Sequence, residues 1–100
     1  MSQAVRLGDS CMGHGDFPAR ANDEGSLNVF INGKGAHRKG DHWAAHCNSV
    51  PVCHDSVAAS GSPNVFVNGK ALCRVGDSVA CGSSMAEGSP NVFVNNLGGG

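Results

Sequence analysis

The sequence predicts an all-β domain, a closed pseudo-threefold assembly of short β-hairpins with almost no helix. The main observation is a repeat: residues 26–41 and 62–77 align without gaps, which chance does not produce in a chain of 100 residues. Each copy contains a β-branched and aromatic run, an Asn-Gly pair and a closing Gly-Asp. In addition, no window keeps the 3.6-residue apolar period of an amphipathic helix over a helical length.

Each copy is expected to fold as a β-hairpin. Asn-Val-Phe followed by Ile or Val forms a short strand at 28–31 and again at 64–67. The Asn-Gly pair that follows is the strongest short signal for a hairpin turn. The residues from there to Gly-Asp then form the return strand and its exit turn. A single Asn-Gly pair could mark an ordinary loop, but two in the same surroundings favour hairpins.

A third copy is divided between the two ends of the chain. Its first half is Ser-Pro-Asn-Val-Phe-Val-Asn at 89–95, and its second half is Arg-Leu-Gly-Asp at 6–9. We therefore expect a closed ring of three units, the third assembled from the two termini, within one domain over residues 1–97. Two longer connections, 10–25 and 42–60, carry most of the candidate ligands described below. Residues 98–100, Gly-Gly-Gly, are expected to be a disordered tail.

The composition indicates that hydrophobic burial alone stabilises this domain weakly. The chain has 15 Gly, one Trp, four Phe and no Tyr, so it has few large side chains to bury. The gain from their burial must offset an ordering cost of about 1–2 kcal/mol per backbone residue. Small domains of this kind usually add disulfides or a metal. An odd cysteine count, five beside five histidines, and synthesis in the cytoplasm argue against a complete disulfide framework. A mixed His/Cys metal site is therefore the favoured hypothesis.

Charge and motifs exclude several classes of function. With a formal net charge of −1 and no clustered basic stripe, nucleic acid is not an expected partner. The sequence has neither an apolar run of about 20 residues nor a signal peptide, so we expect synthesis in the cytoplasm and export by another route. It has no Gly-x-Ser-x-Gly elbow, no phosphate-binding glycine loop and no zinc-deaminase motif. We predict that the protein is not an enzyme.

The candidate metal ligands follow the threefold repeat. His14 and His46 each lie five residues after the Gly-Asp of their unit, and Cys81 lies four residues after the third Gly-Asp. Equivalent positions in three equivalent units converge on the pseudo-threefold axis, which leaves a fourth tetrahedral position along it. His54 is the best candidate for that position. Three His and one Cys match zinc, with iron as the alternative on ligand type; a metal with four protein ligands would be structural.

Alternatives to these ligands stay open from the sequence. His42, directly after a Gly-Asp, could take the place of His46. His14, which has Gly on both sides, and His54 could instead be exposed loop residues, and Cys81 competes with the other four cysteines.

The remaining His and Cys side chains are expected to be structural. His37 and Cys73 occupy equivalent places in the return strands of the two complete repeats. Cys11, Cys47 and Cys53 are expected to be free, small side chains or to lie behind the ligands, with a disulfide between Cys47 and Cys53 as the alternative.

Two tetrapeptides resemble the PAAR-repeat motif, which is named for Pro-Ala-Ala-Arg. They are Gly-Ala-His-Arg at 35–38 and Ala-Leu-Cys-Arg at 71–74, each after Asn-Gly-Lys and before Gly-Asp. The same pattern is seen in Gly13-His14-Gly15, in the run Gly-Asp-x-Trp-x-x-His that ends at His46, in His54 and in Cys81-Gly82. Neither tetrapeptide spells PAAR, but the changes fall on strand residues and leave the ligand set intact.

The resemblance implies a fold and a site. The expected fold is a small cone of short β-strands with a structural zinc near its vertex. The family's three His and one Cys ligands carry over onto His14, His46, His54 and Cys81, the set that the repeat symmetry also selects.

The resemblance also implies a function. The expected role is a tip that caps and sharpens the trimeric β-helical spike of a contractile injection machine, a phage tail or a type VI secretion system, and aids puncture of the target envelope. The implied partners are that trimer, bound end-on by one tip, and transiently the target membrane; alone, the chain is expected to be a monomer. We expect it at the tip of a virion tail or secretion spike, as a bare tip without an effector extension. The alternative is a small zinc-binding adaptor module for protein–protein interaction.

Overall fold

The computed structural model describes residues 2–94, which form an all-β domain without a helix. This part of the chain therefore contains no helix long and apolar enough to cross a membrane. The expected glycine tail at 98–100 lies outside the described residues. The strands are β1 (Ser2–Gln3), β2 (Phe30–Ile31), β3 (Lys34–Gly35), β4 (His42–Cys47), β5 (Cys53–Val57), β6 (Phe66–Val67), β7 (Lys70–Ala71) and β8 (Phe93–Val94).

The strands pair as four antiparallel two-stranded sheets, and two of them are the predicted repeat hairpins. β2 pairs with β3 and β6 with β7. In each hairpin both turn residues have positive φ, 54° at Asn32 and Asn68 and 78° at Gly33 and Gly69. Asn-Gly accepts this conformation at little steric cost, which is why the pair marks a tight hairpin turn.

The third hairpin is built from the two ends of the chain, as the divided repeat predicts. β1 pairs with β8, so that Ser2 lies opposite Val94 and Gln3 opposite Phe93. The backbone N–H of Ala4 extends this pairing by donating to the carbonyl of Val92 at 3.0 Å. The chain therefore closes into a ring of three units.

A cyclic set of backbone hydrogen bonds marks the pseudo-threefold axis. The N–H of Val5 donates to the carbonyl of Cys73, the N–H of Cys73 to that of His37, and the N–H of His37 to that of Val5, each at 3.0 Å. These residues occupy the same place in their three units. Each unit therefore satisfies a backbone group of the next, and the ring cannot form unless all three units are present.

A buried ion pair closes each unit. In the unit built from the two ends of the chain, Asp9 accepts hydrogen bonds from the backbone N–H of Arg6 at 2.8 Å and from its guanidinium at 2.9 and 3.0 Å. Such a paired arrangement satisfies both charges away from water. The Gly-Asp that closes every repeat is therefore structural. The three pairs are Arg6–Asp9, Arg38–Asp41 and Arg74–Asp77.

The turn asparagines join neighbouring units. The side-chain oxygen of Asn68 accepts hydrogen bonds from Ser26 at 2.7 Å and from Arg38 at 2.9 Å, while its amide donates to Asn28 at 2.9 Å. The second example of this arrangement is Asn32 with Ser89, Arg6 and Asn91.

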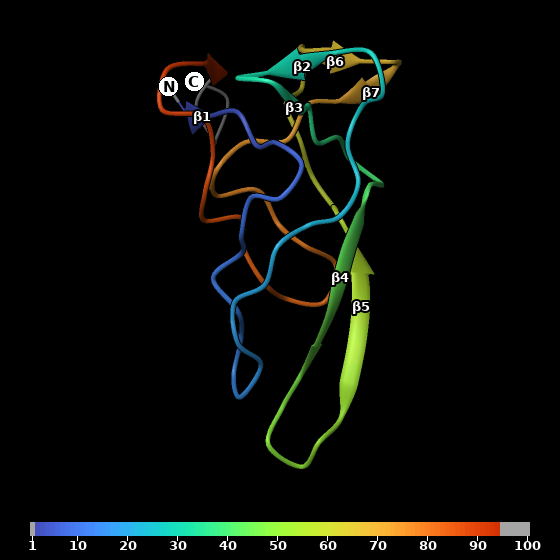
Figure 1. Ribbon diagram of the computed structural model, residues 1–100, viewed down its shortest axis with the longest axis vertical. Helices are drawn as coiled ribbons and strands as arrows, with labels where there is room; N and C mark the ends of the chain where they lie inside the picture. Colours follow the sequence, from blue (N-terminus) through green and yellow to red (C-terminus); the bar gives the residue numbers. More distant parts are fainter. Residues whose placement is uncertain (1, 95–100) are drawn as a thin grey trace.

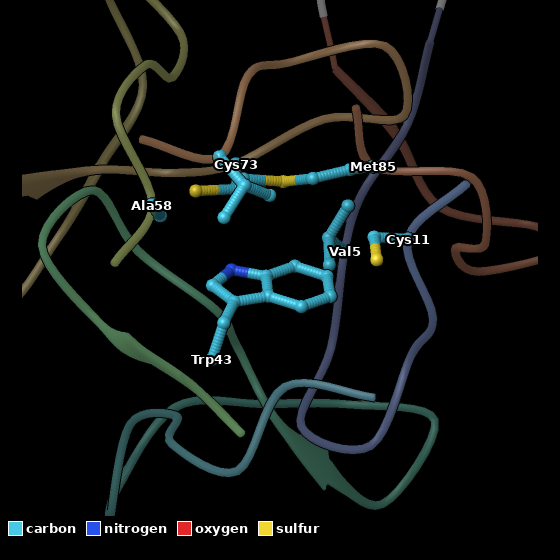
Figure 2. Close-up of a cluster of buried hydrophobic side chains, with 7 residues drawn as sticks. Val5, Cys11, Trp43, Ala58, Cys73 and Met85 are labelled. Atoms are coloured by element: carbon cyan, nitrogen blue, oxygen red, sulfur yellow. The ribbon is translucent and has the colours of Figure 1, made fainter. Parts of the chain in front are cut away.

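The hydrophobic core has two layers. One layer, at the repeat hairpins, combines equivalent residues of the three units: Ala4, Ala36 and Leu72 with Ile31, Val67 and Val94. The other layer is centred on Trp43, which is fully buried. Figure 2 shows Val5, Cys73 and Met85 gathered around its indole ring. Both layers consist of few and mostly small side chains, in agreement with the composition.

The longest strands lie where the sequence predicted only a connection. Residues 42–60 contain the hairpin of β4 and β5, in which His46 lies opposite His54 and Cys47 opposite Cys53. Figure 1 shows the three repeat hairpins gathered at one end of the molecule and the β4–β5 hairpin extending toward the other, along the longest axis of a 39 × 28 × 23 Å body. The molecule narrows toward the β4–β5 turn, as the expected cone requires.

The prediction that Cys47 and Cys53 are free thiols is wrong. The two residues form a disulfide, because the register of β4 and β5 places their Cα atoms 4.1 Å apart. Cys11, Cys73 and Cys81 are free. The alternative that the sequence left open is therefore the one that the structure adopts.

Candidate metal centre

Three separate segments bring the four candidate ligands together. His46 projects from β4 and His54 from β5, at directly opposite positions of the hairpin. His14 comes from the loop that follows Gly8-Asp9, and Cys81 from the turn that follows Gly76-Asp77. The structure thus gathers all four residues selected from the sequence into one group. Their ligation of a metal stays a prediction.

The spacing of the four ligand atoms suits a metal ion. They all lie within 4.8 Å of one another. The Nε2 atom of His14 is 3.2 Å from those of both His46 and His54, and the latter two are 2.6 Å apart. The Cys81 sulfur is 4.0 Å from His46 Nε2. Tetrahedral metal–nitrogen bonds of about 2.0–2.1 Å hold nitrogen ligands about 3.3 Å apart. The cluster can therefore hold a four-coordinate metal ion.

His46 is prepared to ligate through Nε2. The Nδ1–H of His46 donates to the carbonyl of Pro18 at 2.8 Å, which leaves the Nε2 lone pair facing the centre of the cluster. Desolvation, and then the proximity of His46 and His14, lower the pKa of His54 below its usual value. A lowered pKa favours the neutral imidazole, which is the form that binds a metal.

Phe17 covers the imidazoles. Its ring centroid lies 4.2 Å from that of His54, 4.8 Å from that of His14 and 4.9 Å from that of His46. The tight loop that positions it is closed by two backbone hydrogen bonds between His14 and Phe17. Gly13 makes this loop possible, because its φ is 78° and a Cβ there would lie 2.5 Å from the Phe17 carbonyl oxygen.

Arg20 connects the cluster with the core. Its guanidinium donates to the carbonyl of Ala44 at 2.6 Å, to the Cys11 sulfur at 3.1 Å and to the Cys81 sulfur at 3.6 Å. The guanidinium carbon lies 5.3 Å from the centre of the Trp43 ring.

Neither Phe17 nor Arg20 was assigned a role from the sequence. For Phe17 a signal existed, since it is the one phenylalanine outside the repeated Asn-Val-Phe. Arg20 carries no comparable signal, because its contacts come from segments distant in the chain.

His42 lies outside the cluster. Both of its ring nitrogens contact carboxylates, Nδ1 that of Asp23 at 2.6 Å and Nε2 that of Asp55 at 2.7 Å. The contact with Asp55 raises the pKa of His42 most, and the contact with Asp23 raises it further. The geometry thus does not support the alternative in which His42 replaces His46.

His37 and Cys73 are structural, as predicted. Both are fully buried in the ring of backbone hydrogen bonds. His37 Nδ1 is 2.6 Å from the Glu24 carbonyl oxygen, and the ring meets Trp43 edge-on. Burial lowers the pKa of His37 and raises that of Cys73.

Comparison with known families agrees with the repeat pattern. A family model described as the PAAR motif matches residues 2–87 and, in a second and overlapping match, residues 57–98. No curated protein matches the chain.

Proposed function

Because the chain belongs to the PAAR-motif family, we propose that it is the tip that caps and sharpens the trimeric β-helical spike of a contractile injection machine. The machine is a phage tail or a type VI secretion system. The role is mechanical: the tip covers the unpaired strand edges at the end of the β-helix and gives the spike a narrow point that aids puncture of the target envelope.

The observation that carries this proposal is the closed pseudo-threefold at the wide end of the molecule. A monomer with three equivalent hairpins can make three equivalent contacts with a trimer, and a target without threefold symmetry could use only one of them. The cyclic hydrogen bonds among Val5, His37 and Cys73 fix the axis along which the trimer would dock.

Exposed apolar side chains on the three hairpins support the same partner. Phe30, Phe66 and Phe93 occupy equivalent positions and are 60%, 59% and 46% exposed. In β2 and β6 the next residue, Ile31 or Val67, is buried, so the phenylalanines lie on the opposite, outward face. Repeated exposed apolar residues indicate an interaction surface.

Zinc is the metal that we propose for the four-residue cluster. Imidazole and thiolate ligands in a tetrahedral set are typical of structural zinc sites, and iron fits the ligand types less well. Four protein ligands leave no position for a reactive water, which supports a structural role and argues against catalysis. The metal would tie the hairpin, the His14 loop and the Cys81 turn together near the narrow end.

Mass measurement under native conditions tests the docking model. The chain is mixed with the trimeric spike protein encoded nearest to its own gene. We expect one chain per trimer, and the chain alone should be monomeric. Three chains per trimer, or stable self-association of the chain, would contradict the model.

A pair of variants locates the contact. Phe66→Ser should weaken binding of the trimer, because it removes one of the three equivalent apolar side chains. Val50→Ser, at an even more exposed apolar position in the β4–β5 turn, should leave binding unchanged. Equal losses from the two substitutions would place the contact elsewhere.

A further inference from the structure

Arg20 is the one guanidinium of the described chain that contacts a candidate ligand through its side chain. It is half-buried in the loop before the repeat at 26–41. Its Nη2–H donates to the Cys81 sulfur at 3.6 Å and its Nη1–H to the Cys11 sulfur at 3.1 Å. The two sulfurs are thus held on different amino groups of the same side chain.

The position of this guanidinium is fixed from two further sides. Nε–H donates to the Ala44 carbonyl of β4 at 2.6 Å, and Trp43 lies beneath the guanidinium at 5.3 Å, within the range of a cation–π contact. Because the five N–H groups of arginine lie in one rigid plane, fixing Nε also fixes the directions of both amino groups. Trp43 belongs to the buried core layer, so the core determines where the donors to sulfur point.

We propose that Arg20 is a positioning residue of the metal centre, which orients the Cys81 sulfur through a hydrogen bond that persists when the metal is bound. This inference rests on the proposed metal site, not on the proposed spike. A thiolate that gives one lone pair to a metal keeps others that accept hydrogen bonds. Groups that hold a ligand from behind typically change metal affinity about 10–100-fold when they are removed.

The same geometry explains which cysteine joins the cluster. Cys11 is buried beside the site, yet its sulfur accepts a hydrogen bond from Nη1 of Arg20, whereas the Cys81 sulfur accepts one from Nη2. Arg20 thereby holds the Cys11 sulfur on a different amino group from the one that contacts the ligand. The residue selects Cys81 as well as orienting it.

Cobalt(II) is the probe for the test, since it takes zinc's tetrahedral sites and shows a sulfur-to-cobalt charge-transfer band. Wild type, Arg20→Gln and Arg20→Lys are loaded with cobalt. Lys39→Gln is the control: it removes one positive charge from an exposed position. The position of the band and the rate of cobalt release to a chelator are measured for each protein.

Both Arg20 variants should bind cobalt with a charge-transfer band shifted to longer wavelength, because a sulfur that loses a hydrogen-bond donor becomes more electron-rich. Cobalt release should accelerate about 10–100-fold. Lysine keeps the charge but cannot reach the Ala44 carbonyl and both sulfurs, so Arg20→Lys should release cobalt as fast as Arg20→Gln. The Lys39→Gln control should match wild type in both measurements.

Three results would overturn the inference. The first is a charge-transfer band and a cobalt release rate in Arg20→Gln that equal those of wild type. If that variant does not fold, the same result in Arg20→Lys counts instead. The second is failure of both variants to fold in the presence of cobalt, because a general structural role would then account for Arg20. The third is absence of cobalt binding by the wild type. That result would refute the proposed metal site itself, whereas the first two would refute only the role of Arg20.

Discussion

His46 and His54 lie directly opposite each other in the β4–β5 hairpin, with their Nε2 atoms 2.6 Å apart. A cation between the two rings would accept a lone pair from each Nε2 atom. Desolvation and the other two histidines lower the pKa of His54. Protonation of its imidazole is therefore disfavoured, and the neutral ring stays free to bind a metal cation. The hairpin therefore presents half of a metal site before any other segment joins it.

The irregularity in β4 explains how that strand serves both the core and the site. Trp43 pairs with Ser56, and His46 with His54, so β4 has one residue more than β5 between these pairs. In a regular strand, residues three apart point to opposite faces. The extra residue turns His46 to the side on which Trp43 is buried, so that both point inward.

The first prediction separates His46 from His42. His46→Ala should abolish retention of the metal, because it removes one of four ligands. His42→Ala should retain about one metal per chain, since both His42 ring nitrogens face carboxylates outside the cluster. Elemental analysis after desalting measures this directly. Metal loss from His42→Ala together with retention by His46→Ala would refute the assignment of ligands.

The second prediction concerns the buried ion pairs. Asp41→Asn should lower the free energy of unfolding by about 3–5 kcal/mol, because it leaves the buried Arg38 guanidinium without its counter-charge. Asp16→Asn, in an exposed loop position, is the matched control and should change stability by less than about 0.5 kcal/mol. Denaturant unfolding of the zinc-loaded proteins measures both. Similar stability of the two variants would show that the Gly-Asp repeat is not structural.

The third prediction is a pH dependence that comes from His42. Its pKa is raised in the folded chain by Asp55 and then Asp23, so its ion pairs stabilise the fold fully below the unfolded pKa of about 6.5. This contribution is lost as the pH rises through the folded pKa. The melting temperature of wild type should therefore exceed that of His42→Gln near pH 6, and the difference should vanish toward alkaline pH.

Zinc is kept in excess in that experiment, so that ligand protonation affects both proteins alike. Added salt should reduce the difference near pH 6, since His42 and both carboxylates are exposed to solvent. A difference that grows with pH would contradict the assignment.

The repeat made much of the fold predictable. Asn-Gly pairs, Gly-Asp closures and the division of the third copy between the termini each correspond to an observed feature: a tight turn, an ion pair and the β1–β8 pairing. Equivalent spacing after Gly-Asp also selected three members of the cluster. These inferences succeed because each depends on local turn geometry or on symmetry.

The β4–β5 hairpin was not predictable in the same way. The extra residue between Trp43 and His46 breaks the two-residue alternation that identifies a half-buried strand. The turn at 48–52 has no Asn-Gly; it is held by Asn48, whose side chain accepts the N–H groups of Val50 and Val52. Without the hairpin, the register that brings Cys47 to Cys53 could not be deduced, so the disulfide stayed only an alternative to free thiols.

The last prediction is that removal of the metal unfolds the domain. The metal would join three segments that are otherwise connected only by the Trp43 layer and a few hydrogen bonds, such as those of Arg20 to Ala44 and Cys81: the β4–β5 hairpin, the His14 loop and the Cys81 turn. Apparent zinc-binding free energies in small domains are about 10–16 kcal/mol, as large as the whole net stability of a typical domain, about 5–15 kcal/mol. Few and small core side chains cannot replace that contribution here.

A chelator titration with two readouts, one on the Trp43 layer and one on the threefold ring, tests this. The near-ultraviolet circular dichroism of Trp43 reports on the layer beneath the cluster, and hydrogen exchange at the His37 and Cys73 amides reports on the threefold ring. We expect both signals to be lost together, because Val5 and Cys73 belong to both parts. Their backbones form the hydrogen bonds of the ring, and their side chains pack in the Trp43 layer. A chain that loses its metal but keeps the Trp43 signal and the slow amides would show that the ring is stable by itself. The metal would then serve only the narrow end, and a site so easily emptied would no longer fit a structural role.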